Sequence, residues 1–411
     1  MKDLKMGQGG DILRLKEVMD TGIKYIVMRR KKSGFLQRIN MNPLEQRIIE
    51  KIQKEGPITF ETFMEMALYE PRLGYYTSEK TDIGKSGDFY TSPHLHPAFG
   101  AMIGRQIVEM WEIMGRPDDF HIIEAGAGAG YMCKDILDYF CSKSFNPMGY
   151  VIVENNPFMK NKQVKLLEDH LERLKWVSLL EELKNLRGCV LSNELLDAFP
   201  VHLIEMEDEL KEIFVMSDKN TLIEIKGNPS THAIVDCLNE FSIVLAEGYR
   251  TEVNLRIKDW LKSVDEALSE GFILTIDYGY PAWNYYNEDR NRGTLLCYYR
   301  HQLVEDPYIN IGDQDITAHV NFSSVKKWGE DLGLKTLGFC QQGTFLIALG
   351  IDDIIQELYK DSTDYLFEIA KIKRLIFPGT LGESHKVLIQ YKGKGSPELR
   401  GFSIKNQADK L

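Results

Sequence analysis

Residues 121–130, HIIEAGAGAG, decide the fold of this chain. An apolar run ends in an acid, Glu124, and three glycines follow at every second position: Gly126, Gly128 and Gly130. Glycine adopts positive φ and leaves room for a ligand against the backbone. A strand that turns through such a loop into a helix, here expected over 131–140, forms a nucleotide-type pocket at the carboxyl edge of a parallel sheet.

The spacing of the glycines limits the class of ligand that the loop can bind. Dinucleotide binding requires G-x-G-x-x-G, but this chain has Tyr131 where the last glycine would stand. The G-x-G-x-G form after an acid instead indicates S-adenosylmethionine (SAM), which has no pyrophosphate to place on a helix N-terminus. The alternative is a glycine-rich turn without a ligand. A dehydrogenase is disfavoured by the same spacing.

A second acid supports SAM binding. Residues 150–154 predict the next strand, which ends at Glu154. In doubly wound folds an acid about 20 residues beyond the glycine loop binds the ribose, because a carboxylate accepts two hydrogen bonds from a cis-diol. The alternative is a solvated glutamate at a strand end. We therefore expect a cofactor site that includes Glu124, Gly126, Gly128, Gly130 and Glu154.

Composition limits the class of protein. The chain has 411 residues, 43% of them hydrophobic and 27% charged, as in an ordinary globular protein. Its net charge of −11 argues against a nucleic-acid footprint, which needs a basic face. The six cysteines form no C-x-x-C pair, and no apolar run reaches the ~18 residues of a membrane span. Residues 1–40 lack a secretory hydrophobic segment, and their acids (Asp3, Asp11, Glu17 and Asp20) disfavour a mitochondrial transit peptide despite the basic cluster 29–32. We therefore expect a cytoplasmic protein of bacterial type rather than a mitochondrial one.

Strands that alternate with helices predict a Rossmann-like, doubly wound α/β fold with a mostly parallel sheet. We expect a loosely ordered extension over 1–40 and an N-terminal helical segment over 41–117, which contains a turn-rich loop. The methyltransferase-type core follows over 118–392, with an inserted β-meander at about 201–227. Further expectations are a helix over 351–373, a strand over 344–349 and a loose polar tail over 393–411.

Residues 192–200, SNELLDAFP, follow the fourth predicted strand. At that edge Asn193, Glu194 and Asp197 would lie beside the methyl-donor end of the cofactor. Glu194 and Asp197 are three residues apart and would share one face of a helical turn. Two carboxylates there match the planar donor fork of a guanidinium. The alternative is a helix start, with Asn193 as its N-cap and the acids favoured by the helix dipole.

Two other segments contain polar side chains that are candidates for the site, and the second of them ends at the same edge of the sheet. Residues 87–93, GDFYTSP, form a turn-rich run upstream of the core, with an acid and small hydroxyls that suit an ammonium group. Asp277 ends a fifth predicted strand and is either a site acid or a solvated strand end. The nine histidines show no metal-ligand spacing, so we expect no metal site.

Taken together, these runs resemble the MidA family of SAM-dependent methyltransferases. The matches occur in the family's order: 74–76 to G-Y-Y, 87–93 to G-D-F-x-T-S-P, 124–130 to E-x-G-x-G-x-G, 193–202 to N-E-x-x-D-A-x-P-V-H, 277–279 to D-Y-G, and 315–322 to D-[IL]-T-A-x-V-[DN]-F. The resemblance spans about 43–392. The chain departs from the pattern at Ala125 and at Asn321, where an Asp is common.

The resemblance implies a fold, a cofactor and a substrate class. Its mitochondrial members are assembly factors of respiratory complex I that act as protein arginine methyltransferases, so a protein substrate is implied, such as a complex I subunit or its homologue. It implies that the 193–202 segment faces the substrate. It also implies that the 87–93 loop covers and binds the cofactor, for which we name Gly87, Asp88, Thr91, Ser92 and Pro93, together with Asn193.

Methyl transfer to nitrogen is an in-line attack that needs positioning and electrostatics rather than a metal. Glu194 and Asp197 are our candidates to hold the substrate guanidinium, and His202 or Asp277 our candidates to take its proton. Two alternatives stay open: a small-molecule methyltransferase, favoured by an enclosed pocket under the meander, and a non-catalytic assembly factor that binds SAM. The sequence does not determine the oligomeric state.

Overall fold

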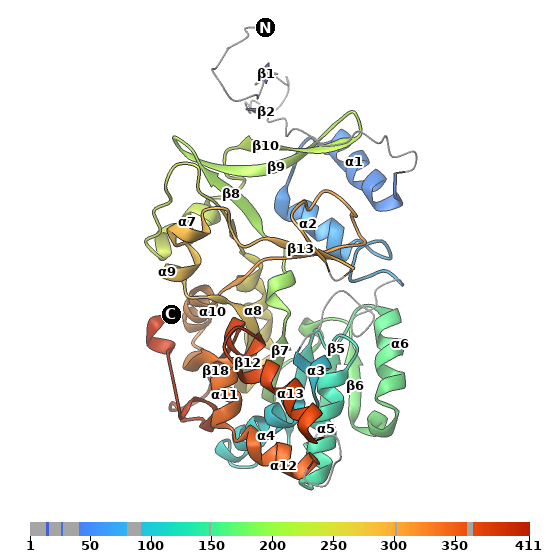
Figure 1. Cartoon of the computed structure of the whole chain (residues 1–411), viewed down its shortest axis with the longest axis vertical. Coiled ribbons are helices and arrows are strands. Elements are labelled where there is room, and N and C mark those ends of the chain that lie inside the picture. Colours follow the sequence, from blue (N-terminus) through green and yellow to red (C-terminus); the bar gives the residue numbers. More distant parts are fainter. Residues whose placement is uncertain are drawn as a thin grey trace. The chain divides into compact units, whose positions relative to one another are not determined.

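The structure is a computed structural model that describes residues 14–15, 26–27, 41–79, 92–147, 149–300, 302–359 and 365–411 (Figure 1). The extension expected over 1–40 lies outside the described residues, apart from the paired short strands β1 (Arg14–Leu15) and β2 (Ile26–Val27). The chain divides into two compact units. We call them the α/β unit (82–198, 257–285 and 319–411) and the β-rich unit (1–81, 199–256 and 286–318).

The α/β unit is built on one sheet with strand order β17-β18-β12-β7-β4-β5-β6, and β16 pairs with β12 outside this row. The pairs among β12, β7, β4, β5 and β6 are parallel, and β18 is antiparallel to both of its neighbours. The strands are β4 (Phe120–Ala125), β5 (Gly149–Val153), β6 (Leu174–Val177), β7 (Leu186–Asn193), β12 (Leu268–Tyr280), β16 (Val320–Asn321), β17 (Lys335–Gln341) and β18 (His385–Lys392). The doubly wound, mostly parallel sheet predicted from the sequence is confirmed.

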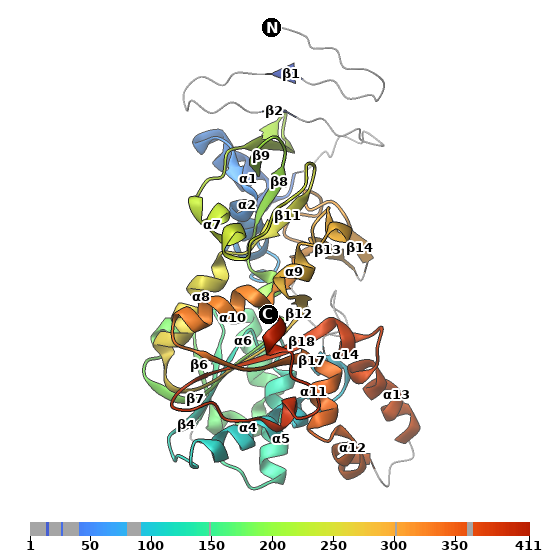
Figure 2. The ribbon, with the colours of Figure 1, turned by 90° about the vertical axis from the view of Figure 1, so that its left-hand side faces the viewer.

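Helices cover both faces of this sheet, with α8 and α10 on one side and α4 and α5 on the other (Figure 2). The central strands are therefore buried on both faces, which is why they are almost continuously apolar. The helices are α3 (Ser92–Leu95), α4 (Ala98–Ile113), α5 (Tyr131–Ser142), α6 (Pro157–Leu166), α8 (Arg256–Ala267), α9 (Ala282–Tyr285), α10 (Phe322–Asp331), α11 (Gln342–Ala348), α12 (Ile351–Tyr359), α13 (Tyr365–Ile376) and α14 (Leu381–Ser384). Short 3₁₀ turns occur at Glu168–Arg173, Leu180–Glu182, Leu196–Ala198, Arg400–Phe402 and Ala408–Lys410.

The β-rich unit has its own hydrophobic core, which includes Ile48, Phe60, Phe63 and Val215. Its main sheet has the order β1-β2-β10-β9-β8-β11, and three further strands form a small sheet ordered β14-β13-β15. Its elements are α1 (Pro43–Glu55), β3 (Ile58–Thr59), α2 (Phe60–Tyr69), β8 (His202–Met206), β9 (Leu210–Asp218), β10 (Thr221–Gly227), α7 (His232–Glu240), β11 (Arg250–Val253), a 3₁₀ turn (Glu288–Arg290), β13 (Leu296–Tyr299), β14 (Gln302–Val304) and β15 (Asp315–Thr317).

The meander expected over 201–227 corresponds to β8, β9 and β10, which pair antiparallel in that order. It shares a unit with α1 and α2, whereas α4, which the sequence grouped with them, packs in the α/β unit against α5. The β-rich unit combines segments that are distant in sequence, because β3 pairs with β9 and so joins residues near 58 to residues near 215.

Two predicted elements differ in the structure. The strand predicted over 344–349 is the helix α11, in which Phe345, Leu346 and Ala348 are buried; a short apolar run alone does not distinguish the two. The tail beyond 393, expected to be loose, packs on the α/β unit. The ring of Phe402 contacts Phe345 with centroids 5.4 Å apart, and the carbonyl of Lys410 accepts a hydrogen bond from Trp283 Nε1 at 3.1 Å. The helix predicted over 351–373 corresponds to α12 and α13, with residues 360–364 outside the described residues.

Candidate active site

The glycine loop lies where the strand order reverses. Strand β4 pairs with β5 on one side and β7 on the other, so its carboxyl end is the switch point at which such sheets bind ligands. Gly126 has φ +72° and Gly130, directly before α5, has φ +94°. A Cβ added to Gly126 would lie 2.9 Å from Leu195 Cδ1, so the loop backbone packs against the segment that carries Glu194.

Glu154 follows β5 and is tied to the glycine loop through a buried glutamine. Its Oε1 accepts the backbone N–H of Asn156 at 2.8 Å, and its Oε2 accepts Gln163 Nε2 at 3.0 Å. The same Nε2 donates to the carbonyl of Gly128 at 2.8 Å, while Gln163 Oε1 accepts Trp176 Nε1 at 2.9 Å. Burial raises the pKa of Glu154, against the opposing effect of these donors.

Gln163 is a residue that sequence reasoning missed. It is fully buried, which is unusual for an amide side chain, and its three hydrogen bonds make it a link between the loop and the acid. A single glutamine within an otherwise ordinary helix gave no pattern that could have identified it.

Glu124 lies inside the core. Its side chain is 1% exposed and its Oε2 accepts the hydroxyl of Tyr150 at 2.5 Å, which joins β4 to β5. Burial raises the pKa of Glu124 to about 7, and the Tyr150 hydrogen bond opposes that rise only in part. Since the carboxyl of Glu124 is buried against Tyr150, we expect it to act on the cofactor site indirectly, by fixing the end of β4 from which the glycine loop starts.

Three carboxyl groups meet at the ends of β7 and β12, with His385 of β18 beside them. Asp277 accepts backbone N–H groups from Leu195 at 3.2 Å and Leu196 at 2.9 Å through Oδ2, and from Tyr278 at 2.9 Å through Oδ1. Asp277 therefore holds the turn after β7 in place. Burial, then Asp197 and Glu194, raise the pKa of Asp277 well above its usual range.

Glu194 stands at the start of this turn with φ +49°, a left-handed conformation that costs energy in a residue with a Cβ. Its Oε1 accepts Asn193 Nδ2 at 3.2 Å and the backbone N–H of Ser92 at 3.4 Å, and it lies 3.6 Å from His385 Nε2. Burial opposes ionisation, but His385, Asn193 and Ser92 outweigh it and lower the pKa of Glu194. Glu194 is therefore the ionised member of the group.

Asp197 lies in the 3₁₀ turn Leu196–Ala198, so the regular helix expected after β7 does not form. The sharing of a helical face by Glu194 and Asp197, and the helix start with Asn193 as N-cap, are both incorrect, because Glu194 leaves the helical region of φ. The two acids converge through the turn instead. Burial, with a smaller contribution from Glu194, raises the pKa of Asp197 to about 7.

Two buried acceptor atoms at this place have no hydrogen-bond partner among the described residues: Asn193 Oδ1 and Asp197 Oδ1. Buried acceptors normally have a donor, because leaving them unpaired costs about 1–3 kcal/mol. A ligand with N–H groups would provide it. The ammonium of SAM and the guanidinium of an arginine both carry such groups, so these residues fit either one.

The remaining predicted residues are placed as follows. Gly87, Asp88 and Thr91 lie outside the described residues, whereas Ser92 and Pro93 open α3, and Ser92 contacts both Glu194 and Gln342. His202 belongs to the β-rich unit, where its Nδ1 lies 2.7 Å from Oε1 of the buried Glu212. His385, which sequence reasoning missed, is the histidine beside the acids; nothing but its place at a strand start could have indicated it.

Among the described residues no three His, Cys, Asp or Glu side chains are grouped so as to hold a metal ion. Over the same parts of the chain, no helix combines the length and the apolar character needed to cross a membrane.

The strand order, the glycine loop at the switch point and the acid after the next strand define a SAM-dependent methyltransferase. The chain belongs to the MidA family of S-adenosyl-L-methionine-dependent methyltransferases, whose family model matches residues 102–340, more than half of its length. Its fold is similar to that of a COG1565 superfamily member from Burkholderia thailandensis bound to S-adenosyl-homocysteine. That structure has a TM-score of 0.82 and 28% identity, with 90% of this chain and 96% of the other covered.

Relatives by sequence include the Drosophila melanogaster protein named "Protein arginine methyltransferase NDUFAF7 homolog, mitochondrial", 25% identical over 88% of this chain and 87% of the relative. The Homo sapiens protein arginine methyltransferase NDUFAF7, mitochondrial, is 25% identical over 79% of this chain and 77% of its own. The names of these relatives contradict the cytoplasmic location that we expected, since both relatives are named as mitochondrial proteins. That expectation relied on the acids within residues 1–40, a weak criterion for location.

Proposed function

We propose that this chain transfers the methyl group of SAM to a guanidinium nitrogen of an arginine in a protein. The observation that carries the proposal is the group formed by Glu194, Asp197 and His385, where one acid is held ionised and the next has an unpaired buried oxygen. The names of the fly and human relatives, both protein arginine methyltransferases, support the same substrate class.

For the cofactor, we propose that the backbone of Gly126, Gly128 and Gly130 lies against SAM and that Glu154 binds its ribose hydroxyls. Gln163 fixes the separation between these two parts through hydrogen bonds to Gly128 and Glu154. SAM supplies an electrophilic methyl group on a sulfonium, and the protein has only to place the acceptor nitrogen in line with it.

For the substrate, Glu194 provides the negative charge. An arginine enters protonated, because its pKa exceeds about 12, and a carboxylate binds the planar guanidinium through charge-assisted hydrogen bonds. Asp197 lies beside Glu194 and has a pKa of about 7, since burial and the neighbouring charge disfavour its ionised form. A base with a pKa near the working pH is suited to accept the proton that the guanidinium loses on methylation.

We therefore favour Asp197 as the proton acceptor over His202 and Asp277, the two candidates named from the sequence. Asp277 accepts three backbone N–H groups and is needed to hold the turn. His202 is paired with the buried Glu212 in the other unit. We assign Asp277 the role of a positioning residue, and we propose that Ser92 and Pro93 lie near the cofactor because the backbone N–H of Ser92 donates to Glu194.

We further propose that the protein substrate is a subunit of respiratory complex I or its homologue, in keeping with the resemblance to the family's assembly factors. The test is to incubate the purified chain with methyl-labelled SAM and a lysate of its source, then hydrolyse the labelled protein and separate the methylated amino acids. Label in methylarginine of one protein is the expected result. Label found only in small molecules would contradict the proposal.

A further inference from the structure

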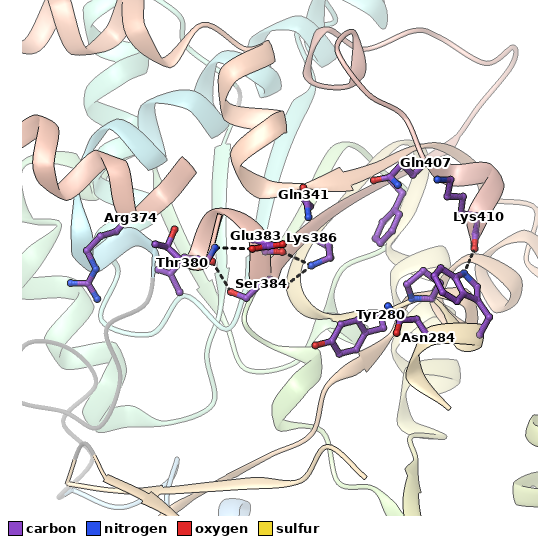
Figure 3. Close-up of a pocket in the computed structure, with 15 residues that line it drawn as sticks. Tyr280, Asn284, Gln341, Arg374, Thr380, Glu383, Ser384, Lys386, Gln407 and Lys410 are labelled. Atoms are coloured by element: carbon purple, nitrogen blue, oxygen red, sulfur yellow. Dashed lines mark hydrogen bonds between the residues drawn. The ribbon is translucent and has the colours of Figure 1, made fainter. Parts of the chain in front are cut away.

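A cavity of about 810 Å³ lies on the α/β unit, between the carboxyl ends of β12 and β17, the start of β18 and the C-terminal 3₁₀ turn (Figure 3). The mechanism proposed above does not use it. Its lining includes Tyr280, Trp283, Phe339, Arg374, Lys386 and Lys410. All of its lining residues belong to the α/β unit, so its shape does not depend on the β-rich unit.

The cavity adjoins the acid group along two strands. The acid group consists of Glu194, Asp197 and Asp277, with His385 beside them. On β12, Asp277 belongs to this group and Tyr280 lines the cavity; on β18, His385 is followed directly by Lys386, which lines the cavity. The rings of Tyr278 and His385 are 5.6 Å apart, and Lys386 Nζ is 5.9 Å from the Tyr280 ring centroid. From Asp277 to Tyr280 is three residues of strand, or about 10 Å.

The charge of the lining is opposite to that of the whole chain. Three lining side chains are cationic, Arg374, Lys386 and Lys410, and one is acidic, Glu383, in a chain of net charge −11. Glu383 accepts the backbone N–H of Gly379 at 2.7 Å and so is engaged within its own loop. Among the described residues, none of the three cations takes part in an ion pair with a carboxylate.

Lys386 is the cation of the lining whose charged form is disfavoured by burial, so a bound anion would stabilise it. Its Nζ donates to the backbone carbonyls of Glu383 at 2.5 Å and Ser384 at 2.8 Å, which leaves one of three ammonium donors for a ligand. Burial lowers the pKa of Lys386 to about 8, with Glu383 opposing the shift. A bound anion would favour the charged lysine.

The shape and the apolar lining suit a chain rather than a compact ion. Figure 3 shows Arg374 at one end of the cavity and Lys410 at the other, with Lys386 between them. Trp283 is 64% exposed, an unusual exposure for a large aromatic side chain, and it lines the same cavity. Aromatic and arginine side chains together are typical of protein-binding surfaces.

We propose that this cavity binds an acidic segment of the protein substrate, next to the arginine that is methylated. The inference rests on the proposed function and adds a feature of the substrate: acidic side chains about two to four residues from the target arginine. This distance follows because an extended peptide advances about 3.3–3.6 Å per residue, against about 10 Å along β12 from Asp277 to the cavity residue Tyr280.

The test compares two peptides of about twelve residues with a central arginine. One carries glutamates about three residues to either side, and the other carries glutamines there. Binding is measured by fluorescence anisotropy of labelled peptides at low salt. We expect the wild-type chain to bind the glutamate peptide roughly tenfold more tightly, as two or three partly exposed ion pairs would give.

The double variant Arg374→Glu with Lys410→Glu should lose this preference. The control, Lys373→Glu with Lys405→Glu, makes the same charge change at exposed lysines outside the lining, and it should keep the preference. Circular dichroism and SAM affinity should match the wild type in both. Equal binding of the two peptides by the wild type, or equal losses in the two variants, would overturn the proposal.

Free glutarate is the third arm. If it displaces the labelled peptide at the concentration at which unlabelled peptide does, the cavity binds a small anion and the proposal is wrong. Methylation of the same peptides is measured in parallel. If the wild-type chain methylates both peptides but binds them equally, the role of the cavity is wrong and the proposed function stands. If the wild-type chain prefers the glutamate peptide but forms no methylarginine, the proposed function is wrong and the binding role of the cavity stands.

Discussion

Replacing Asp197 by asparagine tests the chemistry proposed for the acid group. Asparagine keeps the shape of the side chain but cannot accept a proton at neutral pH. Asp197 is 6% exposed and its backbone lies in a turn that Asp277 holds through Leu195 and Leu196, so the fold should tolerate the change. Methyl transfer should be lost while SAM binding is kept, because Glu154 and the glycine loop are unchanged.

The size of the effect follows from the pKa of Asp197. Burial raises it from 3.8 to about 7, so the side chain is half ionised near neutrality and about a tenth ionised one pH unit lower. If ionised Asp197 is the base, the wild-type rate rises with pH through about 7 and falls about tenfold per unit below it. A positioned base contributes about 10²–10⁴-fold, so the variant should be slower by that factor, with no step near pH 7.

The assay is the single-turnover rate of methyl transfer at saturating SAM between pH 5.5 and 9, with SAM affinity measured by calorimetry on the same preparations. Glu194→Gln should also keep SAM affinity and lose turnover, because an amide cannot pair with the guanidinium charge. Asp169→Asn, the same change at an exposed acid, is the control. A step near pH 7 that survives in Asp197→Asn would refute the role of this residue, and loss of SAM binding would place it in the cofactor pocket.

Three further predictions concern the cofactor side. Gly126→Val should abolish SAM binding in calorimetry, because φ +72° and the 2.9 Å approach of Leu195 leave no room for a branched Cβ; unchanged affinity would contradict this. Gln163→Leu should weaken SAM binding roughly tenfold or more, because Glu154 Oε2 and Trp176 Nε1 each lose a hydrogen-bond partner, which costs about 1–3 kcal/mol per buried group. The control Gln46→Leu, on the exposed face of α1, should not change SAM binding. Glu124→Gln should gain stability relative to wild type as pH rises. The raised pKa of about 7 makes the native protein lose stability from about pH 4.5 to above pH 7, roughly 3 kcal/mol in all, which urea unfolding at pH 5 and 8 would detect.

Much of the α/β unit could be predicted because its signals are local. The glycine spacing, the strand before it and the helix after it lie within about 20 residues, and the structure has β4, the loop and α5 at those positions. The β-rich unit was harder, since it is assembled from three separate segments through pairings such as β3 with β9. Periodicity within one segment carries no information about such a partner.

Single residues of the site were also predictable only where their signal lay in the local sequence. Glu194 and Asp197 could be selected because they follow a strand at the ligand edge, but the turn that brings them together depends on φ +49° at Glu194, which no sequence pattern indicated. Gln163 and His385 were missed because each acts through a partner distant in sequence, Gly128 in one case and Glu194 in the other.

The strain at Glu194 and the buried acids have a common explanation. In a regular helix start, the carboxylate of Glu194 would interact with the helix dipole. Because Glu194 is left-handed instead, the backbone N–H groups of Leu195 and Leu196 turn towards Asp277 and donate hydrogen bonds to it. Asp277 thus stabilises the turn, and the turn places Asp197 beside Glu194 in a buried environment that raises the pKa of Asp197. Removing Asp277 should therefore disorder both acids at once. This is why its loss would resemble loss of the catalytic group, although the hydrogen bonds that it accepts from described residues come from backbone N–H groups.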